Sequence, residues 1–136
     1  MKLQLITYGK NQFDINKFEP IKNDFIKPFG GLWSSPINSN YGWFDWCKEN
    51  DFGDLSCSFR FDFIGNVFII DNVNHLKKLS WISFMCPDFE KLIKLKYDAI
   101  YLTEKGEKET RFSDPSFYGW DCESVLIMNP SKIKEK

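Results

Sequence analysis

The stretch Ser56-Cys57-Ser58-Phe59-Arg60-Phe61-Asp62-Phe63 alternates apolar and polar side chains without a break. Successive side chains of a β-strand point to opposite faces of the sheet. One cysteine and three phenylalanines therefore share one face, and the polar residues share the other. This pattern predicts a strand with its aromatic face in the core.

Further strands are expected on both sides of this stretch. Gly65-Asn66 follows it as a turn, and the apolar run after that turn predicts a buried strand joined to the first in a hairpin. In chain order, the other segments with strand patterns are Leu3–Tyr8, Leu32–Ser35, Val67–Ile70, Asp98–Thr103 and Ser124–Met128.

Helical segments are short and lie between the strands. Tyr41–Glu49 has helical spacing, with Asn38, Ser39 or Asn40 as its cap. Asp71 or Asn72 can cap a second short helix, and Pro87 opens a third. Glu104–Glu107 is expected to be a turn. Short strands with helices inserted between them predict an α+β domain.

Length and composition limit the domain organisation. The chain has 136 residues, of which 43% are hydrophobic and 27% charged, so a single packed domain is expected. We assign residues 1–130 to this domain and residues 131–136 to a polar C-terminal tail. A net charge of −1 argues against a protein that coats nucleic acid.

Several observations concern location and metals. The sequence has no apolar run of the roughly 18 to 20 residues that span a bilayer, and its first residues lack the pattern of a signal peptide. We therefore expect a cytoplasmic protein with no membrane partner. The four cysteines are scattered and only one histidine is present, so we expect no metal site.

Two segments carry residues suited to ligand chemistry. In Pro28–Pro36, two glycines precede Trp33, Ser34 and Ser35, a combination that suits stacking and hydrogen bonding to a flat polar ring. The alternative is a glycine turn with Trp33 in the core. In Tyr118–Ser124, Asp121 and Glu123 are expected to share a strand face, either as a functional pair of carboxylates or as two solvated acids.

The order of these motifs resembles small phage and bacterial domains of the ADP-ribosyltransferase superfamily, which include the ADP-ribosylating type of anti-CRISPR protein. The resemblance rests on Tyr8-Gly9, Gly31-Leu32-Trp33-Ser34-Ser35, Tyr41-Gly42-Trp43-Phe44-Asp45-Trp46-Cys47, Tyr97-Asp98-Ala99-Ile100 and the segment Trp120–Pro130. The chain departs from the family in having Tyr8 where His or Arg is usual.

This resemblance implies a split β-sandwich of two small sheets with short helices, holding NAD as substrate between the sheets. It places six residues at NAD: Tyr8, Gly9, Gly31, Trp33, Ser34 and Tyr41. It also requires a catalytic acid, for which we favour Glu123, with Asp121 and Glu104 as alternatives.

The function implied is NAD-dependent ADP-ribosylation of a macromolecular target, either a protein or a nucleic acid, with protein preferred. A phage-encoded enzyme of this kind would act against host defence in the host cytosol. The alternative is a catalytically inactive domain of the same fold that binds and blocks a partner protein.

Overall fold

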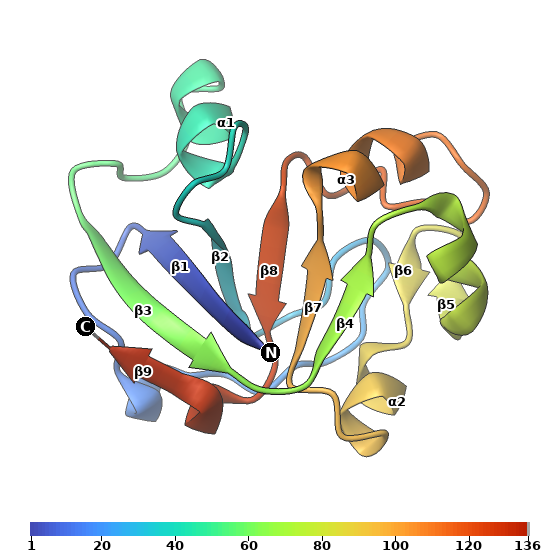
Figure 1. Cartoon of the computed structure of the whole chain (residues 1–136), viewed down its shortest axis with the longest axis horizontal. Helices are drawn as coiled ribbons and strands as arrows, with labels where there is room; N and C mark the ends of the chain where they lie inside the picture. Colours follow the sequence, from blue (N-terminus) through green and yellow to red (C-terminus); the bar gives the residue numbers. More distant parts are fainter. Residues whose placement is uncertain (136) are drawn as a thin grey trace.

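The computed structural model describes residues 1–135 as strands, short α-helices and 3-10 helices (η) (Figure 1). In chain order the elements are β1 (Lys2–Tyr8), η1 (Ile15–Lys17), β2 (Leu32–Pro36), α1 (Trp43–Glu49), β3 (Ser58–Ile64), β4 (Val67–Ile70), η2 (Val73–Lys78), β5 (Trp81–Ser83), β6 (Cys86–Pro87), α2 (Phe89–Lys94), β7 (Ala99–Leu102), α3 (Glu104–Thr110), β8 (Ser124–Ile127), η3 (Pro130–Lys132) and β9 (Ile133–Glu135). The predicted α+β class is confirmed.

Seven of the strands form one sheet in the order β4-β7-β8-β2-β1-β3-β9, and β5 pairs with β6 in a small second sheet. Every neighbouring pair is antiparallel except β4 and β7, which are parallel. The resemblance implied a split β-sandwich of two small sheets. The structure has instead one seven-stranded sheet, which contains most of the strands, and one two-stranded sheet.

The large sheet has two wings (Figure 1). One contains β1, β3 and β9, the other contains β8, β7 and β4, and β2 lies between them. β1 pairs with β3 along its whole length, but with β2 only through Leu5↔Pro36 and Ile6↔Ser35. The short pairing leaves the wings free to diverge on either side of the β1–β2 contact.

One face of the large sheet, here called the phenylalanine face, carries the predicted aromatic pattern. Phe61 pairs with Leu5 and Phe63 with Leu3 across β1 and β3. Phe59, Phe61 and Phe63, which were predicted to lie in the core, are buried in this cluster together with Val125 and Ile127. Val67 and Ile69 were also expected to be buried, but they are half-buried because they lie on the edge strand β4.

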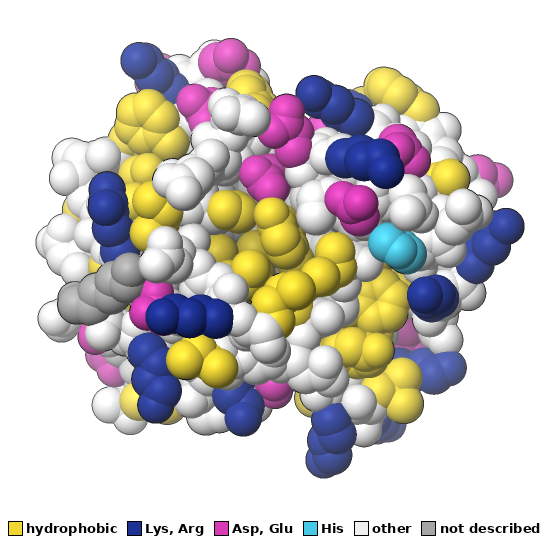
Figure 2. Space-filling model, viewed as in Figure 1, with side chains coloured by type: hydrophobic (Ala, Val, Ile, Leu, Met, Phe, Trp, Pro, Cys, Tyr) yellow, Lys and Arg dark blue, Asp and Glu magenta, His cyan; other side chains and the backbone are white. Residues whose placement is uncertain are grey.

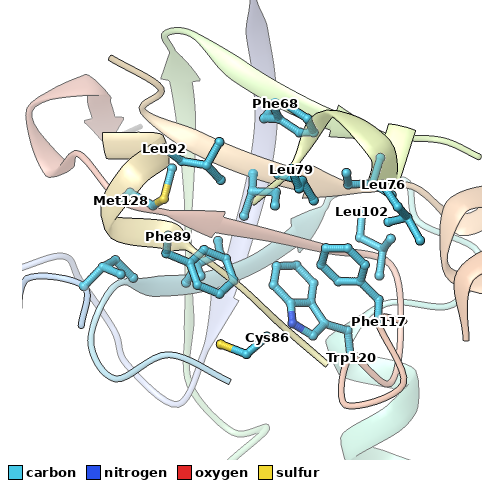
Figure 3. Packing of buried hydrophobic residues seen from close by; sticks show 14 residues of the cluster. Phe68, Leu76, Leu79, Cys86, Phe89, Leu92, Leu102, Phe117, Trp120 and Met128 are labelled. Atoms are coloured by element: carbon cyan, nitrogen blue, oxygen red, sulfur yellow. The ribbon is translucent and has the colours of Figure 1, made fainter. Parts of the chain in front are cut away.

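The opposite face, here called the tryptophan face, is covered by α2, η2 and the β5–β6 hairpin, which enclose a second cluster of buried residues (Figure 3). Trp120 is fully buried at its centre. Its ring meets Phe117 edge-on at 5.0 Å and lies parallel to Phe89 at 6.3 Å. Such aromatic contacts add to the free energy gained by burying apolar area.

Two local expectations are wrong. β3 and β4 do not form a hairpin: β3 pairs with β1 and β9, whereas β4 pairs with β7. The Asp98 carboxylate accepts a hydrogen bond from Asn66 N at 2.8 Å, which directs the chain toward β7. The expected turn at 104–107 is the start of α3, because the Thr103 hydroxyl caps it by accepting from Gly106 N at 3.0 Å.

The expected C-terminal tail is also structured as far as residue 135. Pro130 starts η3 under an Asn129 cap, and β9 then pairs with β3 through Ile133↔Phe63. The apolar Ile133 packs against the phenylalanine face, which gives this short polar segment an anchor. Lys136 lies outside the described residues.

Candidate functional site

A pocket of about 330 Å³ opens on the tryptophan face between the end of β1, β2 and the segment from α1 to residue 55. We call it the tryptophan pocket. Five of its lining residues are aromatic: Tyr8, Trp33, Trp43, Trp46 and Phe52. The lining also includes two charged residues, Lys27 and Asp54, as well as Gly9 and Cys47.

The backbone explains how these rings come together. Trp33 in β2 lies beside the end of β1, and Trp43 and Trp46, three residues apart, share one face of α1. Ser35 joins the elements, because its Oγ accepts from Trp43 N and donates to Glu123 O, both at 2.9 Å. One buried hydroxyl thus fixes the start of α1 against β2 and β8.

The tryptophans form a connected series from the core to the surface. Trp33 meets the buried Trp120 at 4.7 Å and Trp43 at 5.8 Å, and Trp43 meets Trp46 at 5.7 Å. All three contacts are edge-to-face, the arrangement that the ring quadrupole favours. The indole N–H of Trp43 is buried and has no hydrogen-bond partner among residues 1–135.

Lys27 connects the aromatic wall to a carboxylate. Its Nζ lies 5.5 Å from the ring centre of Trp33 and 5.3 Å from that of Trp43, both within the range of cation–π attraction. The same Nζ is 3.5 Å from Asp121 Oδ2. Asp121 therefore lies next to the tryptophan pocket.

The structure brings together three of the residues predicted to contact NAD. Tyr8, Gly9 and Trp33 all line the tryptophan pocket. The interpretation of Trp33 as a residue closed within the core is not what the structure shows, since its ring is only partly buried and forms part of the pocket wall.

The other three predicted NAD contacts lie elsewhere. Gly31, at φ +75°, borders a separate pocket of about 260 Å³ beside Lys10 and Phe13. Ser34 is fully buried, and its hydroxyl donates to Val125 O at 2.9 Å. Tyr41 donates its hydroxyl to Glu49 at 2.6 Å, and this hydrogen bond raises the pKa of Tyr41 to about 12.

Glu123, the favoured acid, lies just before β8 and points to the phenylalanine face. Only 9% of it is exposed, and its carboxylate accepts hydrogen bonds from the hydroxyls of Ser39 and Tyr101. Burial, followed by the hydrogen bond to Glu123, raises the pKa of Tyr101 well above its usual value. The interpretation of Glu123 as a solvated acid is therefore wrong.

Asp121 and Glu123 do not share a face. β8 begins only at Ser124, so the period of two does not extend back to Asp121. Asp121 pairs with Lys27 beside the tryptophan pocket, whereas Glu123 meets Tyr101 on the other side of the sheet. The third candidate acid, Glu104, begins α3, where hydrogen bonds from Lys108 and Asn40 lower its pKa.

A second hollow lies on the phenylalanine face. Figure 2 shows hydrophobic side chains gathered between the two wings on the face turned toward the viewer. Its wall includes Leu3, Pro36 and Tyr101, around a pocket of about 410 Å³. Tyr101, which lines this hollow, donates its hydroxyl to Glu123, whereas Asp121 pairs with Lys27 beside the tryptophan pocket.

Within residues 1–135, no three histidine, cysteine, aspartate or glutamate side chains cluster so as to hold a metal ion. No helix in that part of the chain is long and apolar enough to cross a membrane. All four cysteines are free thiols, and burial raises the pKa of Cys47 in the pocket wall, which disfavours its reactive thiolate form.

Sequence reasoning missed Lys27, Trp43, Trp46 and Phe52 as pocket residues. Trp43 and Trp46 belong to the aromatic segment on which the resemblance rests, but Tyr41 was the one residue of that segment expected at NAD. Lys27 had no comparable pattern. Its position depends on the bridge that pairs Lys22 with Phe29 and folds the intervening segment back.

Comparison with protein-family models, with curated proteins and with solved structures found no match for this chain.

Proposed function

We propose that this protein is an NAD-dependent ADP-ribosyltransferase that binds the nicotinamide end of NAD in the tryptophan pocket. One observation supports the proposal most strongly. Tyr8, Gly9 and Trp33, which the resemblance assigns to NAD, come from two separate sequence segments and line the same pocket.

The chemistry of the pocket suits a flat ring. Its volume of about 330 Å³ is within the roughly 300 to 1,000 Å³ typical of small-molecule sites. Partly exposed indoles provide surfaces on which a planar ring can stack. The buried indole N–H of Trp43 is a donor without an acceptor in the described chain, and a local movement would let a ligand oxygen satisfy it.

In this proposal the catalytic carboxylate is Asp121 and not Glu123. Asp121 is the acid tied to the pocket wall, through its ion pair with Lys27 at 3.5 Å. Glu123 is held by Ser39 and Tyr101 on the opposite face, where it cannot contact a ring placed against Trp33.

The reaction would proceed by breaking the bond between the ribose carbon and the nicotinamide nitrogen. The bonding electrons leave with nicotinamide, which departs as a neutral molecule, and positive charge develops on the ribose. The Asp121 carboxylate stabilises that charge, and the pocket holds the leaving ring in position. A nucleophile of the target then bonds to the ribose carbon and loses its proton.

The test is incubation of the protein with NAD and host lysate, followed by measurement of released nicotinamide and mass spectrometry of the proteins and nucleic acids. We expect free nicotinamide and one target that gains the mass of ADP-ribose. Asp121→Asn should reduce both by about a hundredfold or more, while Glu123→Gln retains them. An absence of nicotinamide release with lysates from several hosts would contradict the proposal.

A second candidate, a non-catalytic module that blocks a partner protein, is favoured by exposed aromatic side chains on neighbouring loops. Phe112 is 82% exposed and contacts Tyr118, and Phe25 contacts Phe84. Ser116 N donates to Phe84 O at 2.8 Å, which links two of these loops. This candidate predicts that NAD leaves the melting temperature unchanged, and that Phe84→Ser and Phe112→Ser each abolish co-purification of one host protein.

A further inference from the structure

The tryptophan pocket combines aromatic faces with carboxylates. Two of its indoles, Trp33 and Trp43, are already in contact with a cation, the Nζ of Lys27. Aromatic rings attract a cation through the negative potential of their faces, and carboxylates near the rings reinforce this attraction. A wall of this composition recognises positive charge in addition to ring shape.

Once Lys27 is set aside, the charged side chains that line the pocket or pair with Lys27 are acidic. Lys27 is the one basic side chain among the lining residues, whereas Asp54 lines the wall and Asp121 lies directly behind Lys27. Hydrogen bonds from Ser56 and Cys57 lower the pKa of Asp54, so this carboxylate is charged at neutral pH. Displacement of the ammonium would leave two carboxylates and the indole faces ready for another cation.

Lys27 is also able to move. Its side chain is about one-third exposed, at 35%, and its ammonium is attached to a flexible four-carbon stem. It makes a single ion pair, with Asp121, among the described residues. A ligand that contacts Trp33 and Trp43 in its place can therefore displace the ammonium into solvent without breaking any element of the fold.

We propose that the tryptophan pocket selects a positively charged planar ring, and that Lys27 is a built-in competitor for the same aromatic faces. This inference rests on the proposed function in one respect: it identifies the charged ring as the oxidised pyridinium of NAD. The reduced dihydropyridine has nearly the same shape but no ring charge, so it gains no cation–π attraction and cannot replace Lys27. Displacement of Lys27 also frees Asp121 to face the bound ligand.

The experiment compares two small probes by isothermal titration calorimetry with the full chain. The probes are 1-methylnicotinamide, which is cationic, and 1-methyl-1,4-dihydronicotinamide, which is neutral and nearly isosteric. We expect the cation to bind at least about tenfold more tightly than the neutral ring. Equal affinities, or tighter binding of the neutral ring, would overturn the inference.

Variants of Lys27 test the competition directly. Lys27→Gln removes the internal cation and should tighten binding of 1-methylnicotinamide about fivefold, with the neutral probe changed less than about twofold. Lys27→Arg keeps a positive charge against the rings and should not tighten the binding of 1-methylnicotinamide. Lys22→Gln, an exposed position of the same segment, is the matched control. Weaker cation binding by Lys27→Gln, in a variant with the wild-type melting temperature, would refute the competition.

The outcome can be separated from that of the proposed function. Cation-selective binding without nicotinamide release from NAD would support the cation-binding pocket and contradict the proposed transferase activity. Nicotinamide release from NAD, without preference between the two probes, would retain the transferase and overturn the role assigned to Lys27.

Discussion

At the scale of single residues, two acids close together in sequence, Asp121 and Glu123, have different surroundings. Asp121 pairs with Lys27 beside the tryptophan pocket, while Glu123 is buried beneath the hydroxyls of Ser39 and Tyr101. A single carboxamide substitution at each position would therefore separate the proposed catalytic role of Asp121 from the structural role of Glu123.

Asp121→Asn should lower the rate of nicotinamide release by about a hundredfold or more, in line with the roughly 2.7 to 4 kcal/mol that one preorganised electrostatic contact contributes. Its free energy of unfolding should change little, because the ion pair it loses is partly solvated. Glu123→Gln should show the reverse: a nearly unchanged rate and a loss of about 1 to 2 kcal/mol of stability, since an amide N–H would face a hydroxyl donor. Nicotinamide release assays and urea unfolding of both variants measure the two effects. A hundredfold loss of rate in Glu123→Gln alone would return the catalytic role to Glu123.

The buried thiol of Cys122 should make the stability of the protein depend on pH. Burial raises the pKa of this thiol from 9.0 to about 12. In the unfolded chain the thiol loses its proton above about pH 9, whereas in the folded protein it stays protonated to about pH 12. The contribution of Cys122 to the free energy of unfolding is therefore complete below pH 9. It is lost as pH rises to about 12, at up to about 1.4 kcal/mol per pH unit. Urea unfolding across this range should show a shallower decline in Cys122→Ala than in wild type. Parallel declines would mean that Cys122 ionises equally in both states.

At the scale of elements, the packing of α3 requires Gly106, although glycine is a poor helix former. A Cβ on Gly106 would lie 2.1 Å from the carbonyl oxygen of Ile70, at the end of β4. Alanine normally stabilises a helix interior by about 1 kcal/mol relative to glycine. Here Gly106→Ala should instead destabilise the protein by about 2 kcal/mol, because α3 must move away from β4.

Glu109→Ala, at an exposed position of the same helix, is the matched control and should change stability by less than about 0.5 kcal/mol. Thermal and urea unfolding measure both variants. If Gly106→Ala raised the melting temperature, the close packing of α3 against β4 would be wrong.

The same elements show which parts of the fold the sequence could predict. β3 and β8 were predictable because their side-chain patterns, alternating in one and continuously apolar in the other, depend on local residues. The partner of β4 was not, since Gly65-Asn66 is compatible with a hairpin, whereas in the structure Asn66 hydrogen-bonds to Asp98 and Lys96 next to β7. α3 was missed because Gly106 suggested a turn, although Thr103 is a good helix cap.

Prediction of the candidate site was limited for a similar reason. Trp33 was identified from its own segment, and the structure does place it in a pocket wall. The choice between Asp121 and Glu123 could not be made from two-residue spacing, since that spacing fixes a common face only within a strand, and β8 starts at Ser124. Lys27 reaches the site only through the path of the segment before β2.

At the scale of the whole molecule, one sheet separates two environments. Its tryptophan face is closed by α2, η2 and β5–β6 over part of its area and opens into the tryptophan pocket beside α1. Its phenylalanine face holds the core shared by the two wings, together with Glu123. Changes to the outer edge of the β1–β3–β9 wing should therefore affect stability more than binding at the pocket.

Removal of β9 tests this separation. β9 covers the outer edge of β3, Ile133 packs on the phenylalanine face, and the Glu135 carboxylate accepts a hydrogen bond from Phe13 N. A chain ending at Lys132 should lose about 2 kcal/mol of stability through lost burial and strand pairing. It should also aggregate more readily, because β3 becomes an unprotected edge.

Binding of 1-methylnicotinamide to the folded fraction should remain within about twofold of wild type, because none of the residues that line the tryptophan pocket belongs to β9. Lys134→Ala, an exposed substitution within β9, is the control and should leave both properties near wild type. Urea unfolding and calorimetry on the same samples distinguish the two effects. A truncated chain with wild-type stability would show that β9 adds nothing to the sheet, whereas a folded one that had lost binding would show that the β1–β3–β9 wing positions the end of β1 at the pocket.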